Sequence, residues 1–274
     1  MKRARLADIS YHQGSFKFLG NLDGIIVKAT EGVWYDPEYI NYLDEVLKVP
    51  VRGSYHYYRT SEDPIVQAKY FDQWTRDQGF HFLAGDYEAY KNTLDRKGAE
   101  NYLLFLLELE KLTDLPIFIY TSPYIYRDNL RVWSEEFDRF PFWIARWKYS
   151  DADVADPTKS LFGDDLQRSW DIWQYTSTGD GSLFGVGSIS IDLSVYNGTA
   201  QEMKSRFIQE IVNMKKFWQS KTFWFFLLAL IISVANAFGF AGFIPEEAYG
   251  EVGVAIISVI GIILRFFTRE GIEP

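Results

Sequence analysis

FLAGDYE (residues 82–88) is an apolar run that ends in Asp86-Tyr87-Glu88. Such a run predicts a buried β-strand. Because alternate residues of a strand share a face, Asp86 and Glu88 are expected to point the same way. Two carboxyl groups held close together repel, so one of them keeps its proton to higher pH. The segment thus predicts a strand with an acid and an anion at its C-terminal end, although an isolated Asp-x-Glu is more simply explained as two solvated carboxylates.

Seven further short, β-rich runs surround this strand along the first 200 residues. They are residues 5–10, 24–29, 51–57, 116–120, 142–146, 171–174 and 190–195, and helix-like segments at 37–47, 63–77 and 95–112 lie between the early ones. Alternating strands and helices indicate parallel β-α-β units. Eight strands in this length predict an α/β fold, a small TIM-like barrel that is poor in helix toward its end.

Two more acids lie on the outermost strands. Asp8 ends the first run in ADIS, and Asp192 lies on the last one in SIDLSVYN. If the barrel closes, the first and eighth strands are neighbours, and both acids can face the mouth that holds Asp86 and Glu88. Taken singly, Asp8 could cap a turn through Ser10, and Asp192 could be an ordinary strand carboxylate. Together the four acids suit hydrolysis of a glycosidic bond, which needs one protonated and one ionised carboxyl group.

Composition excludes several other functions. The chain has 274 residues, no cysteine, three histidines and a net charge of −9. Residues 201–274 hold seven Lys/Arg and seven Asp/Glu, so the whole negative charge lies in the first 200 residues. An acidic domain is a poor partner for nucleic acid, and no zinc-type histidine spacing or phosphate-binding glycine loop is present. We therefore expect no metal and no cofactor. The 18% of aromatic residues suits either a sugar-binding cleft or a large core.

A set of short motifs occurs in a fixed order over residues 5–198. They are DISYHQG, GIIVKATEG, GSYHYY, LAGDYE, IYTSPY, FWIARW and WQYTSTG followed by SIDLSVYNG. The ordered set resembles the family 25 glycoside hydrolases, the Chalaropsis-type lysozymes common in phages and bacteria. The resemblance implies a (β/α)5β3 barrel over residues 1–200. It also implies cleavage of the β-1,4 bond between N-acetylmuramic acid and N-acetylglucosamine, which makes peptidoglycan strands the expected partner.

The same resemblance implies roles for the four acids. Glu88 matches the proton donor, Asp86 the partner that tunes it and stabilises the reacting sugar, and Asp8 and Asp192 the other acids of the cleft. Tyr87 stands where the family commonly has a small aliphatic residue, and strand alternation predicts that its side chain points away from the cleft.

Softer assignments concern residues near the other strand ends. Glu31 and Gln13 are expected in the cleft wall, and His56 is expected to be a packed barrel residue rather than a base. Six aromatic residues are candidates for sugar binding, with core packing as the alternative for each: Tyr55, Tyr57, Tyr120, Trp147, Trp173 and Tyr175.

The end of the chain has a different character. Residues 201–221 predict a helical linker, and residues 222–245 hold no charge over 24 positions, enough for a membrane span at about 222–244. A second apolar run predicts a span at about 250–267, with an interfacial helix as the alternative. This region loosely resembles holin-like two-helix segments of phage lysis cassettes, which implies a transmembrane helical hairpin that contacts membrane lipid and self-associates.

Charge around these runs predicts their topology. Lysines precede the first run, Arg265 and Arg269 follow the second, and glutamates lie between them, so both ends are expected in the cytoplasm. The start, MKRARLADIS, lacks the apolar run of a signal peptide. We therefore expect a membrane-associated protein, at the inner membrane of a bacterial host or in a virion.

Three functions are compatible with these patterns. The favoured one is a membrane-anchored muramidase of the phage lysis type. The others are a non-catalytic wall-binding barrel with a pore-forming tail, and a chitinase-like glycosidase, whose strands also end in Asp-x-Glu. The presence of all four acids argues against the second, and the surrounding motifs argue against the third.

Overall fold

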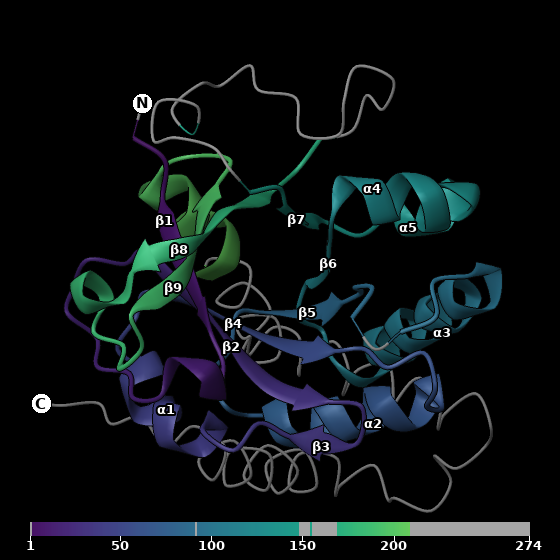
Figure 1. Ribbon diagram of the computed structural model, residues 1–274, viewed down its shortest axis with the longest axis horizontal. Helices are drawn as coiled ribbons and strands as arrows, with labels where there is room; N and C mark the ends of the chain where they lie inside the picture. The colour runs from purple at the N-terminus through teal and green to yellow at the C-terminus, as the bar shows by residue number, and fades with distance from the viewer. Residues whose placement is uncertain (1, 91, 148–153, 155–168, 209–274) are drawn as a thin grey trace, which may run out of the picture. The chain divides into compact units, whose positions relative to one another are not determined.

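Eight strands of the computed structural model form one closed sheet (Figure 1). They are β1 (Arg5–Ile9), β2 (Gly24–Glu31), β4 (Val51–Tyr57), β5 (Phe82–Asp86), β6 (Ile117–Thr121), β7 (Phe142–Ala145), β8 (Ile172–Asp180) and β9 (Ser190–Tyr196). Neighbouring strands run parallel from β1 to β8, whereas β9 is antiparallel to both β8 and β1. The pairing of β1 with both β2 and β9 closes the barrel, as the sequence predicted. A two-residue strand, β3 (Trp34–Tyr35), extends β2 as an antiparallel hairpin.

Helices connect the parallel strands on the outside of the barrel (Figure 1). Helix α1 (Tyr39–Val46) follows β2, α2 (Pro64–Thr75) follows β4, and α3 (Arg96–Leu112) follows β5. Asp63 and Asp95 begin α2 and α3 by accepting hydrogen bonds from backbone N–H groups of the first turn. Short helical turns make up the remaining described connections: η1 (Tyr11–Gln13), α4 (Pro123–Ile125), η2 (Tyr126–Leu130), η3 (Arg131–Trp133), α5 (Ser134–Phe137) and η4 (Gly181–Phe184).

Strand alternation divides the apolar residues into two cores. On β5, Phe82 and Ala84 belong to a cluster inside the barrel, whereas Leu83, and Tyr87 directly after the strand, belong to the larger cluster between the barrel and its helices. A Cβ atom at Gly53 would lie 2.3 Å from the ring of Phe82, so this glycine makes room for the ring in the barrel interior. Each strand therefore presents every second side chain to the barrel axis, which decides what reaches the mouth.

A helix at residues 200–208 closes the barrel at the end where the parallel strands begin. Thr199 and Glu202 form a reciprocal cap at its start. Met203 and Phe207 are buried in the interior cluster, where the ring of Phe207 lies 5.0 Å from that of Phe82. The barrel thus extends at least to residue 208, and the assignment of residues 201–208 to a linker was wrong because their apolar face packs into the barrel.

The structure describes residues 2–90, 92–147, 154 and 169–208, all within the unit Met1–Val212. The two predicted membrane spans lie outside the described residues. Among the residues that are described, no helix has the length and apolarity needed to cross a membrane.

Candidate active site

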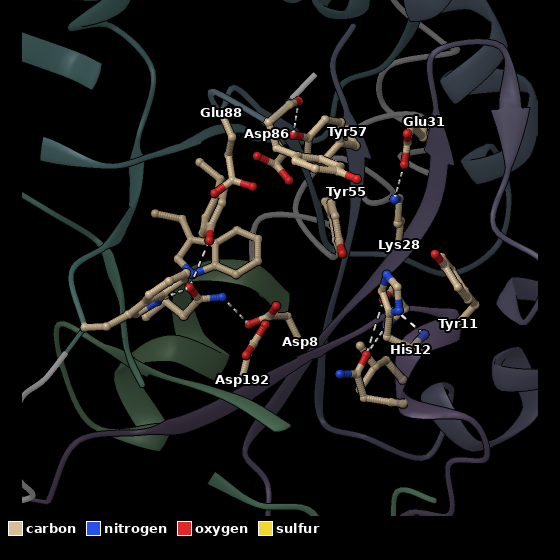
Figure 2. A pocket seen from close by; sticks show the side chains of 18 residues that line it. Asp8, Tyr11, His12, Lys28, Glu31, Tyr55, Tyr57, Asp86, Glu88 and Asp192 are labelled. Atoms are coloured by element: carbon tan, nitrogen blue, oxygen red, sulfur yellow. Dashed lines mark hydrogen bonds and ion pairs between the residues drawn. The ribbon is translucent and has the colours of Figure 1, made fainter. Parts of the chain in front are cut away.

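The carboxyl ends of the strands surround a cleft with a volume of about 410 Å³ (Figure 2). Positions that face the barrel axis change there from apolar to polar. Leu6 on β1 is followed two residues later by Asp8, and Ala84 on β5 by Asp86. The cleft is lined by Asp8, Ile9, Ser10, Tyr11, His12, Gln13, Lys28, Glu31, Tyr55, Tyr57, Asp86, Glu88, Tyr90, Tyr120, Trp143, Trp147, Gln174 and Asp192. The four acids predicted from the sequence are thus brought together in one place.

Asp8 and Asp192 form a close pair. They are direct partners in the antiparallel register of β1 and β9, and Figure 2 shows their carboxyl groups facing each other. Burial and the charge of Asp192 raise the pKa of Asp8 well above its usual range. Burial raises the pKa of Asp192 to about 6, against a hydrogen bond from Asp8 that lowers it. Burial and mutual repulsion therefore make this pair of carboxyl groups harder to ionise than two free aspartates.

Asp86 and Glu88 stand on the opposite wall, at the end of β5. Burial and the nearby Glu88 raise the pKa of Asp86 well above its usual range. Burial, with the charge of Asp192, raises the pKa of Glu88 to about 7, while Lys28 opposes the rise. Oδ1 of Asp86 is buried with no hydrogen-bond partner among the described residues. Near neutral pH this wall holds a protonatable Glu88 beside a buried carboxyl group with an oxygen still able to accept a hydrogen bond.

A basic group balances part of this negative charge. Lys28 on β2 lines the cleft, and its Nζ lies 2.5 Å from Oε2 of Glu31. A dashed line marks this ion pair in Figure 2. The other oxygen of Glu31 accepts from Arg59, and the Lys28 and Arg59 cations lie 5.2 and 5.1 Å from the ring centre of Tyr57. The group of Lys28, Glu31 and Arg59 carries a net positive charge beside the acids, and it places Glu31 in the cleft wall as predicted.

Four of the six candidate aromatic residues line the cleft. Tyr57 and Tyr120 form buried parts of its wall, Tyr55 is partly buried, and the Trp147 ring is 48% exposed. The other two, Trp173 and Tyr175, pack in the outer core and do not line the cleft. Their assignment to sugar binding was wrong because Gln174 between them takes the axis-facing position on β8, which turns both neighbours outward.

Two expectations about non-catalytic residues are confirmed. Tyr87 is fully buried in the outer core, where its ring stacks 4.7 Å from that of Tyr102. His56 is also fully buried, bonded to Thr30 at 2.7 Å and to Gln67 at 3.1 Å, and burial lowers its pKa to about 3. It is therefore a neutral packing residue at working pH. Gln13 lines the cleft and binds the backbone N–H of Ser10 at 2.8 Å.

Sequence reasoning missed several residues of the cleft. Gln174, Lys28, Trp143 and Tyr90 all line it, yet none carried a local signal stronger than its place on a strand or loop. Counting alternate positions outward from the barrel interior would have found Lys28 after Ile26 and Gln174 after Ile172. Within the described part of the chain, no cluster of acidic, histidine or cysteine side chains suited to a metal ion is found.

Comparison with known proteins agrees with this geometry. The sequence model of "Glycosyl hydrolases family 25" matches residues 7–182. The "Uncharacterized protein YegX" of Escherichia coli K12 is 27% identical over 187 residues, which cover 65% of this chain. The matched part spans only 61% of the length of that relative.

Solved structures share the fold. The bacterial lysozyme of Streptomyces coelicolor superposes with a TM-score of 0.60 at 22% identity, over 76% of this chain and 98% of its own. A family 25 glycosyl hydrolase of Bacillus anthracis gives 0.60 at 23% identity, over 74% and 92% of the two chains. With the family match over residues 7–182, these findings establish that the chain belongs to glycosyl hydrolase family 25.

Proposed function

We propose that this protein is a muramidase that cleaves the β-1,4 bond between N-acetylmuramic acid and N-acetylglucosamine in peptidoglycan. The observation that carries the proposal is Glu88, a carboxyl group whose pKa is raised to about 7 in a cleft shared with Asp86, Asp8 and Asp192. A glycosidase needs an acid that is still protonated near neutral pH and an anion beside it. The family match and the lysozyme-like fold support the same activity.

In this proposal Glu88 donates its proton to the glycosidic oxygen as the bond to the leaving sugar breaks. Positive charge then develops on the sugar ring, and an ionised carboxylate stabilises it. Asp86 is assigned that role because its Oδ1 accepts no hydrogen bond from the described residues, and since burial and Glu88 raise its pKa, it acts only in the molecules in which it has lost its proton. The pKa values of Asp8 and Asp192 on the other wall are also raised by burial, so this pair carries less negative charge near neutral pH than two free aspartates.

The aromatic residues of the cleft support a sugar substrate. Tyr57 and Tyr120 present buried surfaces, whereas Trp147 is about half exposed and Tyr90 mostly exposed where the cleft meets solvent. Flat rings at such positions cover the apolar faces of sugar units, and their polar edges bind hydroxyl groups. The cleft is thus suited to a glycan strand that extends beyond the reacting pair of sugars.

Clearing of a purified peptidoglycan suspension by the full-length protein tests the proposal, with the new reducing ends identified chemically. We expect reducing-end N-acetylmuramic acid, loss of at least about 100-fold in rate with Glu88→Gln, and near-normal rate with the exposed control Glu135→Gln. The rate is expected to fall above about pH 7, because Glu88 must be protonated to act.

Other products would contradict the proposal in distinct ways. New ends of N-acetylglucosamine only, with cleavage of chitin oligosaccharides, would indicate a chitinase-like enzyme. Binding to the wall without any new ends would indicate a non-catalytic module.

We also propose that residues 222–267 anchor the enzyme in a bacterial membrane as a helical hairpin that self-associates, for release of the wall-degrading activity in phage-type lysis. The support is the sequence alone: an uncharged stretch of 24 residues, a second apolar run and basic flanks.

A further inference from the structure

The side-chain amide of Gln174 joins three parts of the cleft. The Gln174 side chain is 1% exposed, and it lies on β8, which pairs with β7 on one side and β9 on the other. Its Nε2 donates to Oδ2 of Asp8 at 2.9 Å, a bond marked by the dashed line at Asp8 in Figure 2. Its Oε1 accepts from the Tyr120 hydroxyl at 2.8 Å and from Nε1 of Trp147 at 2.7 Å.

Chemistry fixes the orientation of this amide. The indole N–H of Trp147 can only donate, so the atom that it contacts must be the amide oxygen. The amide nitrogen then faces Asp8, and flipping the group would set two donors against each other at Trp147 and two acceptors at Asp8. Oδ2 of Asp8 is thereby held as an acceptor, on a carboxyl group that is the direct register partner of Asp192.

The two ends of this connection do different work in the proposed reaction. Asp8 is one of the buried acids, whereas the Trp147 ring is 48% exposed at the cleft wall, where a sugar can pack on it. Movement of Asp8 displaces the amide nitrogen, and movement of Trp147 displaces the amide oxygen. Both atoms belong to the same rigid group. Hydrogen bonds of 2.7–2.9 Å weaken when one partner moves by a few tenths of an ångström. Asp8 and Trp147 therefore cannot move independently of the amide that binds both.

We propose that Gln174 is a positioning residue of the glycosidic reaction, whose single amide holds the sugar-stacking ring of Trp147 and the carboxyl group of Asp8 in one fixed geometry. The inference rests on the proposed muramidase function. It assigns Gln174 no contact with the reacting atoms. Its consequence is that a change at Asp8 is transmitted to Trp147, and the reverse.

Two substitutions separate the parts of this role. Gln174→Met keeps the length of the side chain but removes all three hydrogen bonds. Gln174→Glu keeps both acceptor bonds, and its protonated form also donates to Asp8, whereas its ionised form repels Asp8. The introduced carboxyl group would share the cleft with Asp8, Asp192, Asp86, Glu88, Glu31, His12 and Lys28 and with the hydroxyl groups of Tyr11, Tyr55, Tyr57, Tyr90 and Tyr120.

The experiment measures kcat and KM of the full-length variants on peptidoglycan between pH 4.5 and 8.5. We expect Gln174→Met to lose about 100-fold in kcat throughout, as misplaced catalytic groups do. Gln174→Glu should stay within about threefold of wild type at the acid end and fall more than about tenfold below it at the alkaline end.

Gln67→Met is the matched control, since Gln67 is also buried and bonded on both sides of its amide, away from the cleft. It should lose stability and keep the wild-type pH profile.

A second readout does not require activity. In protein labelled with 5-fluorotryptophan, the ¹⁹F resonance of Trp147, assigned through Trp147→Phe, should shift on Asp8→Asn and lose that response in the Gln174→Met background. If the wild type cleaves nothing, the proposed function fails and this resonance alone decides the inference. A Trp147 resonance indifferent to Asp8→Asn, a Gln174→Met variant with wild-type kcat, or a Gln174→Glu variant with a constant ratio to wild type across the pH range would each overturn it.

Discussion

Glu31 and Glu88 show how neighbours decide the state of identical side chains in one cleft. Burial raises the pKa of Glu31, but hydrogen bonds and charge from Lys28 and Arg59 outweigh it and leave the pKa below its usual value. No such cation is bonded to Glu88 among the described residues, and burial raises its pKa to about 7. Glu31 is thus a fixed anion in an ion group, whereas Glu88 is poised to hold or release a proton.

Lys28 is expected to set the pH range of the enzyme. Its charge lowers the pKa of both Asp86 and Glu88, so Lys28→Met should raise both. The alkaline limb of the rate profile, which follows loss of the Glu88 proton, should move to higher pH, while Lys28→Arg should keep it in place. Rate measurements on peptidoglycan across pH check this, and an alkaline limb that stays fixed in Lys28→Met would show that the lysine serves only to hold Glu31.

Glu88→Gln is expected to stabilise the fold while removing activity. The folded pKa of Glu88 is about 7 and its ordinary value is 4.5, so its contribution to stability is fully present below about pH 4.5 and is lost as pH rises through 7. The variant should therefore gain about 1–3 kcal/mol in unfolding free energy over wild type at pH 8, and close to nothing at pH 4. Chemical denaturation at the two pH values measures the difference. Equal gains at both would assign the effect to packing, and Glu135→Gln should change neither.

The sequence located the four acids but only part of their surroundings. Asp86, Glu88, Asp8 and Asp192 could be placed because strand alternation and barrel closure are properties of short, regular segments. The role of Gln174 could not, because its partners come from β1, from β6 and from the segment after β7, and none is near it in the chain. The error at Trp173 and Tyr175 has the same origin: a shift of one residue reverses which face a side chain takes.

Among the secondary-structure elements, the strands could be predicted from the sequence. A helix at 200–208 could also be predicted, but the surface against which it packs could not. The predicted strand 51–57 agrees with β4 (Val51–Tyr57), and the others differ by one or two residues at their ends, except that β8 (Ile172–Asp180) continues six residues beyond the predicted 171–174. Residues 201–221 were predicted to be a helical linker. Which surface that helix covers depends on the open end of the barrel, and only the assembled sheet creates that end. The short helices between β6 and β7 were not predicted, because their apolar residues do not repeat at helical spacing over a long enough stretch.

Phe207 is expected to contribute much of the stability that this helix supplies. Its ring is 1% exposed and lies among Phe82, Phe118 and Tyr196 inside the barrel. Phe207→Ala should lower the unfolding free energy by about 3–5 kcal/mol, because it removes a buried ring and leaves a cavity. The exposed control Gln201→Ala should stay within about 0.5 kcal/mol of wild type. A similarly small effect of Phe207→Ala in denaturant titrations would mean that the barrel is closed without this helix.

For the whole molecule, the charges around the two apolar runs predict that the barrel and its proposed substrate lie on opposite sides of a membrane. Basic residues precede the first apolar run and follow the second, with Glu246, Glu247 and Glu251 between them. If the proposed hairpin forms, the positive-inside rule predicts a cytoplasmic barrel, on the other side of the membrane from its proposed substrate, peptidoglycan. A muramidase in that topology stays separated from its substrate until the membrane is breached, and a pore formed by self-associated hairpins is one way to breach it.

Cysteine labelling tests this topology, and the absence of native cysteine makes each label unambiguous. Single cysteines at Ser61, which is exposed on the barrel, and at Ala248, between the two apolar runs, would be placed in full-length Glu88→Gln protein so that the wall of the expressing cells stays intact. A membrane-impermeant maleimide should label Ala248→Cys in intact cells and Ser61→Cys only after the membrane is opened. Both variant proteins should fractionate with membranes, because transfer of a 24-residue uncharged segment into lipid as a helix is strongly favourable.

Labelling of Ser61→Cys in intact cells would place the barrel outside and remove any need for a pore. Protection of Ala248→Cys in the membrane fraction would mean that the loop does not cross, so that the hairpin is wrong while the muramidase proposal is unaffected.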